Sequence, residues 1–241
     1  LLLWVQPVRA EGNIVSVTVT VLNGHNEVLQ GANVTAYYTS NSSKVPNTGG
    51  RIGSAITDSN GRAVLKLVNG TADASYQIKV VFSGLLLNVT NFDCSTKCPL
   101  TSFSVKLDVY HLTIRVLSSS GDPVPGARVN VTSSLTDPRE IVRNAQTDSS
   151  GNLVVRNLPA GIQYNIDVSY TAVGNVKLTR SVTHTLSSDR TSVEVRLDLY
   201  RISAKLQDMD GNPVQGVTVE LLKGDSATPL LTATSSSDGS V

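Results

Sequence analysis

The sequence is poor in the features that mark most enzymes, membrane proteins and nucleic-acid-binding proteins. It has three His, two Cys and one Met, and its charged residues amount to 16%. Twenty basic and nineteen acidic side chains give a net charge of +1, which supplies no field to attract nucleic acid or an anionic membrane. No apolar run approaches the roughly 18 residues of a membrane-spanning helix, so the sequence predicts no membrane span.

Hydroxyl side chains supply the polarity that charged side chains usually supply. Ser and Thr together account for 52 of the 241 residues. A neutral, hydroxyl-rich and weakly charged chain is typical of extracellular β proteins and unlike disordered chains or coiled coils. The sequence therefore predicts an extracellular or cell-surface location.

An internal repeat of about ninety residues organises the chain, and such a period has to be found before the fold is predicted. Three signatures recur in the same order, and the third repeat contains the first two of them. The first is VLNGHNEVLQGANV (21–34), VLSSSGDPVPGARV (116–129) and LQDMDGNPVQGVTV (206–219); the second is TDSNG (57–61), TDSSG (147–151) and SDG (237–239); the third is VKLDVY (105–110) and VRLDLY (195–200).

Each repeat has the pattern of short β-strands. Apolar and polar residues alternate from Val15 to Val21, the period of a half-buried strand. Asp-Ser-Asn-Gly and Asp-Ser-Ser-Gly are typical of tight turns, because Gly adopts positive φ and Asp accepts bonds from nearby backbone amides. The sequence predicts an all-β fold of tandem Ig-like β-sandwiches, with about seven strands in each complete repeat.

The second repeat resembles a known family. Its segments GDPVPGARV (121–129), TDSSG (147–151) and LPAGIQYNIDV (158–168) are similar to the carboxypeptidase-regulatory-like, transthyretin-like sandwich. The first repeat matches less well because it lacks the Pro-Val step. The resemblance implies an accessory or surface domain, often found in arrays, with no catalytic residues to carry over.

The predicted domains follow one another without a Gly-, Pro- or Ser-rich linker. They are an N-terminal strand segment (1–12), sandwich 1 (13–110), sandwich 2 (111–200) and a partial sandwich 3 (201–241). The inward-facing phase slips by one residue at Tyr110-His111 and again at Tyr200-Arg201. We expect the last strand of one sandwich to run without interruption into the next, which predicts a stiff rod of about 35 to 40 Å per repeat.

The N-terminal segment has two interpretations. Val8-Arg9-Ala10 has the small-residue spacing of a signal-peptidase site, but we favour a structural segment. It would either end a preceding repeat or act as a donor strand that completes a neighbouring molecule by β-augmentation. With Trp4 as anchor, the predicted assembly contact consists of Leu1, Leu2, Leu3, Trp4, Val5 and Val8.

The two cysteines and the sequons point to covalent modification. Cys94 and Cys98 lie in a Ser/Thr-rich loop; a disulfide is favoured over a metal half-site, because no further Cys or His ligand lies near, and it implies an oxidising compartment. Asn33 and Asn130 are expected on an outward face. The five candidate glycosylation sites are Asn33, Asn41, Asn69, Asn88 and Asn130.

No catalytic, cofactor-binding or metal-binding set is predicted. His25, His111 and His184 occupy unrelated positions of the repeat, and there is no nucleophile elbow or phosphate-binding loop. The stretch that begins at Asp208 resembles the start of a calcium loop but lacks the distal Glu, so a β-turn is the better interpretation. We expect no enzymatic activity and no cofactor.

The sequence therefore favours a structural subunit of an extracellular filament, sheath or stalk. Its expected partners are copies of itself, arranged head to tail, or neighbouring repeats of a longer chain, with glycans as a further expectation. The alternative is an adhesin or a carbohydrate-binding region of a larger secreted protein. For that alternative, Tyr37-Tyr38 together with Tyr164 and Tyr170 would form a sugar-stacking patch, although packing within the sandwich accounts for them more simply.

Overall fold

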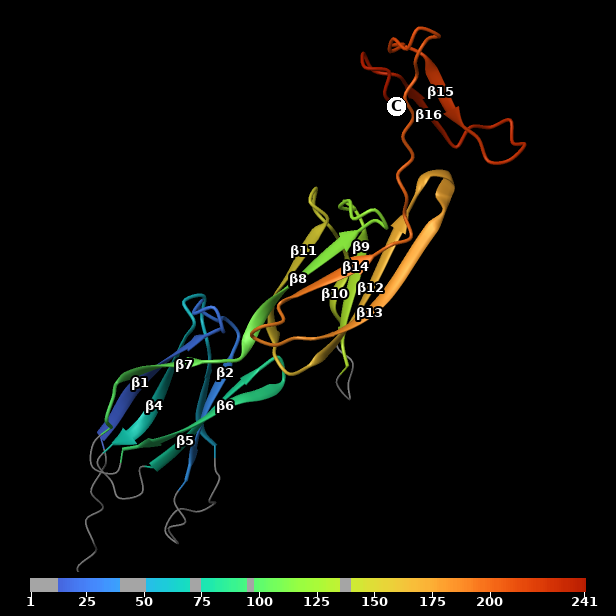
Figure 1. The fold of residues 1–241 in the computed structure, drawn as a ribbon. Helices are drawn as coiled ribbons and strands as arrows, with labels where there is room; N and C mark the ends of the chain where they lie inside the picture. The colour runs from blue at the N-terminus through green and yellow to red at the C-terminus, as the bar shows by residue number, and fades with distance from the viewer. Residues whose placement is uncertain (1–12, 40–50, 70–74, 95–97, 135–139) are drawn as a thin grey trace, which may run out of the picture. The chain divides into compact units, whose positions relative to one another are not determined.

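The computed structural model describes residues 13–39, 51–69, 75–94, 98–134 and 140–241. The chain divides into two compact units. The first contains residues 1–111 with 156–160 and 187–189, and the second contains 112–155, 161–186 and 190–241. Each unit is built from β-strands (Figure 1), and the only helix among the described residues is the three-residue 3-10 turn η1 (Val173–Asn175).

The described residues of the first sandwich form seven strands. One sheet has the order β4-β1-β7 and the other the order β3-β2-β5-β6. Strand β1 pairs antiparallel with β4 and parallel with β7. The strands are β1 (Asn13–Leu22), β2 (Asn33–Tyr38), β3 (Arg51–Ile56), β4 (Arg62–Asn69), β5 (Ser75–Phe82), β6 (Leu85–Asp93) and β7 (Ser102–Lys106).

The second sandwich repeats this topology. Its sheets have the orders β11-β8-β14 and β10-β9-β12-β13, and β14 again runs parallel to the first strand of the repeat. The prediction of about seven strands in each complete sandwich is confirmed. The strands are β8 (Val109–Leu117), β9 (Arg128–Ser133), β10 (Glu140–Gln146), β11 (Asn152–Pro159), β12 (Gln163–Thr171), β13 (Lys177–Thr185) and β14 (Ser192–Arg196).

The period-2 pattern explains where the core of each sandwich lies. Val17, Val19 and Val21 are fully buried, and Thr18 and Thr20 between them face outward, as alternation along a strand requires. Leu112, Ile114 and Val116 are the buried set of β8 in the second sandwich. Val and Ile suit these positions because their branched side chains favour an extended backbone.

The prediction of an uninterrupted strand between the sandwiches is wrong. β7 ends at Lys106 and β8 begins at Val109, and between them the Val109 N–H donates to the Leu107 carbonyl at 2.8 Å. An i to i+2 bond of this kind is an inverse γ-turn, centred on Asp108. The phase slip is nevertheless present, because Tyr110 and His111 are both half-buried between buried Val109 and Leu112.

The same turn recurs ninety residues later, but no strand follows it. The Leu199 N–H donates to the Leu197 carbonyl at 2.7 Å. Residues 201–207 form the isolated bridges Lys205 to Ser240 and Gln207 to Pro213 in place of a strand. The third repeat adds one antiparallel hairpin, β15 (Thr218–Leu221) with β16 (Leu231–Thr234).

Candidate functional site

A buried hydroxyl group forms the same hydrogen-bond node in all three repeats. Thr57 Oγ1 donates to the Leu29 carbonyl at 2.7 Å and accepts the Ala32 N–H at 2.9 Å. Thr147 repeats the arrangement with the Val124 carbonyl (2.7 Å) and the Ala127 N–H (3.0 Å), and Ser235 with the Val214 carbonyl (2.8 Å) and the Val217 N–H (3.0 Å). Each hydroxyl satisfies one donor and one acceptor that are otherwise left unpaired.

The turn that follows each node depends on a glycine. Gly151 has φ +73°, and a Cβ there would lie 2.6 Å from the Val116 carbonyl oxygen. Gly61 has φ +69°, with the corresponding Cβ position 2.8 Å from the Val21 carbonyl oxygen. The Asp148 carboxylate completes the turn by accepting two backbone N–H groups at 2.9 Å. The node and the turn therefore serve the fold of each repeat.

A connected group of polar and titratable side chains lies in the first unit, around buried Asn23. Its Oδ1 accepts the backbone N–H groups of His25 and Glu27, each at 2.9 Å. Its Nδ2 donates to Glu27 Oε2 at 2.8 Å and to Asn157 Oδ1 at 3.2 Å. His111 Nε2 lies 2.8 Å from the same Glu27 oxygen, and the Asn157 N–H donates to His111 Nδ1 at 3.1 Å.

These contacts define the tautomer of His111. Its Nδ1 accepts a hydrogen bond, so the proton is on Nε2 and is donated to the Glu27 carboxylate. Hydrogen bonds first from Asn23 and then from His111 hold the pKa of Glu27 below its usual value. Every nitrogen and oxygen named here has a partner, and the cluster includes no nucleophile. The arrangement supports the local fold and shows no feature of a catalytic centre.

Tyr110 packs against this region in a way that its counterpart Tyr200 does not. A Cβ at Gly24 would overlap the Tyr110 ring, so the absence of a side chain at Gly24 lets the ring lie there. Burial, and then the Asp108 carboxylate, raise the pKa of Tyr110. In the second repeat, Ser119 takes the place of Gly24, and Tyr200 is 72% exposed. It borders a hollow of about 450 Å³ in the second unit.

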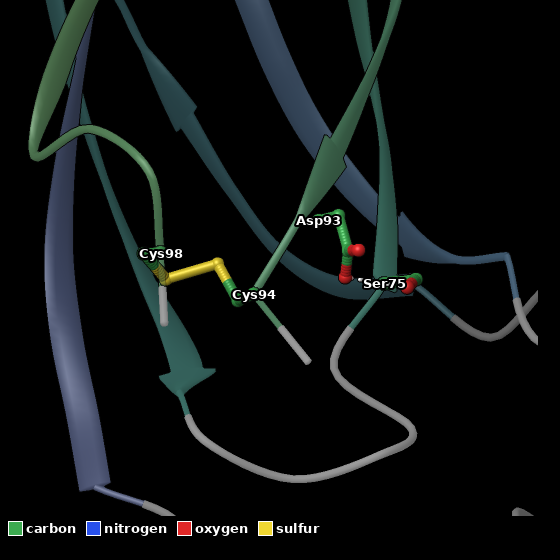
Figure 2. Close-up of a disulfide and its surroundings, with 4 residues drawn as sticks. All are labelled: Ser75, Asp93, Cys94 and Cys98. Carbon is green, nitrogen blue, oxygen red and sulfur yellow. Dashed lines mark hydrogen bonds between the residues drawn. A yellow bond between two sulfur atoms is a disulfide. The ribbon is translucent and has the colours of Figure 1, made fainter. Parts of the chain in front are cut away.

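The structure contains the predicted disulfide between Cys94 and Cys98 (Figure 2). Cys94 follows directly on strand β6, and both cysteines are buried in the core of the first sandwich. Beside them, Ser75 Oγ donates to Asp93 Oδ1 at 2.9 Å, a cross-strand pair at the ends of β5 and β6 (Figure 2).

The predicted glycosylation sites lie in different surroundings. Asn33 is exposed, and its Oδ1 accepts the Thr35 hydroxyl at 3.3 Å. Asn88 is half-buried on β6 and accepts the Thr90 hydroxyl at 2.8 Å. Asn130 is half-buried, and its Oδ1 accepts a hydrogen bond from the Asn144 N–H at 2.7 Å. Asn69 ends β4, and Asn41 lies outside the described residues.

The remaining predicted sites are the N-terminal assembly contact and the turn at Asp208. The predicted assembly contact, Leu1 to Val5 with Val8, lies outside the described residues. Asp208 Oδ1 accepts the backbone N–H groups of Asp210 and Asn212 at 2.9 and 2.8 Å, which is a turn, as the sequence favoured. In the described part of the chain, no group of three or more His, Cys, Asp or Glu side chains is arranged to hold a metal.

Of the tyrosines expected in a sugar-stacking patch, Tyr164 is not available to a ligand. Tyr164 is 1% exposed, and burial raises its pKa. Its ring lies in the core of the second sandwich, so it offers no face to a ligand. Tyr37 has the Lys79 ammonium 4.8 Å from its ring centre, a cation–π contact within the first sandwich.

Residues 111–198 match the carboxypeptidase regulatory-like domain family. The matched segment coincides with the second sandwich. It covers strands β9 to β14 and all of β8 except Val109 and Tyr110. The γ-turn, the hydroxyl node and the Asp-Gly turn of this domain therefore recur, in whole or in part, in the repeats on either side of it.

Solved structures similar to the chain include pilins. The shaft pilin SpaA of Lactobacillus rhamnosus GG is 13% identical, with a TM-score of 0.42 over 79% of this chain and 99% of that one. The minor pilin GBS52 of Streptococcus agalactiae is 14% identical, with a TM-score of 0.33 over 80% and 99%. A streptococcal ancillary pilin is 16% identical, with a TM-score of 0.36 over 76% and 62%.

No curated protein matches the sequence. Among the described residues, no helix is long and apolar enough to cross a membrane.

Proposed function

We propose that this protein is a non-enzymatic structural component of an extracellular filament, sheath or surface stalk, built from tandem β-sandwiches that join head to tail. The observation that carries the proposal is the connection between complete sandwiches. Only Leu107 and Asp108 separate β7 from β8, and they form a hydrogen-bonded turn. A flexible linker would need a longer Gly- or Ser-rich stretch, so this connection suits a load-bearing array.

The chemistry of the chain supports the same role. The described polar clusters consist of groups that satisfy one another, as structural polar groups do. The disulfide suits an oxidising compartment outside the cytoplasm. An array of this kind carries mechanical load through the buried cores of its sandwiches and the short connections between them.

Electron microscopy of the full chain in negative stain tests the proposal. We expect elongated particles that lengthen into linear polymers as protein concentration rises. A matched pair of variants examines the connection: eight Gly/Ser residues inserted after Asp108, and the same insertion in the β5–β6 turn after Ser83. The first insertion should broaden the distribution of bending angles, and the second should leave it unchanged.

Two results would contradict the proposal. If only single particles are seen at every concentration, the chain does not form a polymer. Retention of those single particles on a polysaccharide column would favour a carbohydrate-binding module instead.

A further inference from the structure

A row of side chains crosses the outer face of the four-stranded sheet in the first sandwich. The strand register places Asn33 opposite Ile56 and opposite Val81, and it places Val81 opposite Leu86. Cross-strand neighbours of this kind have Cβ atoms about 5 Å apart. Val34, the next residue along β2, is fully buried, so the row lies on the face that points away from the core. We call Ile56, Asn33, Val81 and Leu86 the outer row.

The outer row exposes aliphatic side chains on both sides of Asn33. Ile56 is 69% and Leu86 is 53% exposed, and Val81 between them is half-buried. Val89 follows on the same face of β6 and is 46% exposed. Covering these side chains would be favourable, because burial removes apolar surface from water.

The corresponding row of the second sandwich is polar. The aligned signatures of the two repeats place Arg128 where Asn33 stands in the first repeat. Arg128 lies opposite Gln146 and Ser169, and Ser169 lies opposite Thr179. The fold therefore does not require aliphatic side chains in this row, and their presence in the first sandwich calls for a separate explanation.

The size and the charge of this surface indicate a small, neutral occupant. A stable interface between proteins takes about 20 to 30 residues on each side, whereas the outer row and Val89 supply only a few aliphatic side chains. Lys79 lies on the same face, but its ammonium group is 4.8 Å from the centre of the Tyr37 ring, a cation–π contact that already engages the charge.

Asn33 supplies a point of covalent attachment in the middle of the outer row. Asn33-Val34-Thr35 is a sequon for N-linked glycans. Asn33 is exposed and is the first residue of β2. A pyranose ring is compact and neutral, with C–H groups on its faces and hydroxyl groups on its rim, so a sugar attached here has the chemistry that the outer row lacks.

We propose that Asn33 carries an N-linked glycan whose first sugars cover the outer row. In the attachment, Asn33 Nδ2 forms a bond to C1 of the sugar and loses one proton, and the bond from C1 to the oxygen of a lipid diphosphate donor breaks, so that the diphosphate leaves with the electron pair. Asn33 Oδ1 still accepts the Thr35 hydroxyl at 3.3 Å, because the reaction uses only the nitrogen. The C–H groups of the sugar then lie against Ile56, Val81 and Leu86, and its hydroxyl groups remain in water.

The test uses the full chain secreted from cells that attach N-glycans through N-acetylglucosamine. Peptide mass spectrometry gives the occupancy of Asn33, and calorimetry gives the unfolding temperature of the first sandwich. A double-mutant cycle isolates the contact between the glycan and the row. Its four chains are the wild type, Asn33→Gln, the pair Ile56→Thr with Leu86→Thr, and all three changes together. Ile56 and Leu86 are exposed, so the pair leaves the core unchanged.

We expect a glycan at Asn33 in the secreted wild type. Asn33→Gln should lower the unfolding temperature by about 3 to 6 °C when the row is aliphatic and by less than about 1 °C when it carries the two threonines. The difference between the two losses measures the contact, because any effect of the Gln side chain itself is common to both.

Three results would overturn the proposal. The first is an unmodified Asn33 in the secreted chain. The second is the same change of unfolding temperature with either row, because the glycan would then make no contact with it. The third is a wild-type dimer that the pair Ile56→Thr with Leu86→Thr abolishes, because a second copy would then cover the row. The outer row belongs to a single sandwich, so none of these results depends on the proposed polymer.

Discussion

At the scale of single residues, the fold of each repeat depends on one buried hydroxyl group that pairs a backbone carbonyl and a backbone N–H. The Thr147 hydroxyl is both donor and acceptor, to the Val124 carbonyl and the Ala127 N–H. Thr147 is 5% exposed, so no solvent replaces the hydroxyl when it is removed. An unpaired buried donor or acceptor costs about 1–3 kcal/mol.

The first prediction is that Thr147→Val lowers the free energy of unfolding by about 2–4 kcal/mol, because the isosteric change leaves two backbone groups unpaired. Thr147→Ser keeps the hydroxyl and should cost about 1 kcal/mol, for one buried methyl group. Urea unfolding of the two variants gives the comparison. A Thr147→Val variant that loses less stability than Thr147→Ser would mean that the methyl group, and not the hydroxyl, matters at this position.

The second prediction concerns the turn glycine. Gly151→Ala meets both a positive φ and the Val116 carbonyl oxygen, whereas Gly126→Ala meets only a φ of +70° with nothing within 4 Å of the new Cβ. The Gly126 change should cost about 1–2 kcal/mol, and the Gly151 change clearly more. Thermal unfolding of the pair measures the difference. If the Gly126 variant is as unstable as the Gly151 variant, the positive φ alone accounts for the loss of stability, and the contact with the Val116 carbonyl oxygen adds nothing.

The third prediction concerns acid. Because the folded pKa of Glu27 lies below its unfolded value, the carboxylate contributes stability above the unfolded pKa. That contribution is lost as pH falls through the folded pKa. The stability difference between the wild type and Glu27→Gln should therefore be constant near neutral pH and shrink in acid below the ordinary pKa of Glu. Urea unfolding from pH 7 to pH 3 measures it, and a difference that grows in acid would contradict the assignment.

At the scale of elements, local patterns predicted the strands, and long-range contacts accounted for what was missed. The alternation from Val15 to Val21 was enough to predict β1. The γ-turn at Asp108 has no Gly or Pro to indicate it. The Asn157 N–H bond to His111 joins residues 46 positions apart, which no local pattern reveals. The sequence comparison matched Ser237 of the third repeat with Thr57 and Thr147, but the hydroxyl that forms the node belongs to Ser235. Only the spacing from Gly239 could have indicated this.

The fourth prediction concerns the Cys94–Cys98 disulfide. The bond closes a loop of about five residues, so loop-closure entropy limits its contribution to about 2 kcal/mol. Replacing both cysteines by Ser should lower the free energy of unfolding by about that amount, together with a smaller loss of buried contacts, and leave the β-sandwich intact. Far-ultraviolet circular dichroism and urea unfolding measure the two effects. An unfolded variant would show that the disulfide is required for folding.

At the scale of the whole molecule, composition constrains how copies can associate. The chain carries 20 basic and 19 acidic side chains, so it has almost no net charge to attract or repel a neighbour. The ion pair between Arg115 and Glu194 on the surface is weak, because the two groups are 3.7 Å apart and both side chains are half exposed. Apolar surface and backbone pairing are then the remaining sources of attraction between copies.

The fifth prediction follows from this balance. If the proposed polymer forms through apolar and backbone contacts, raising NaCl from 0.05 to 0.5 M should barely change its length, because screening acts only on charges. Ammonium sulfate should lengthen it, because excluded salts strengthen the burial of apolar surface. Sedimentation velocity in the two salts separates these effects. Dissolution of the polymer by NaCl would contradict the prediction, because it would place charged side chains at the contact between copies.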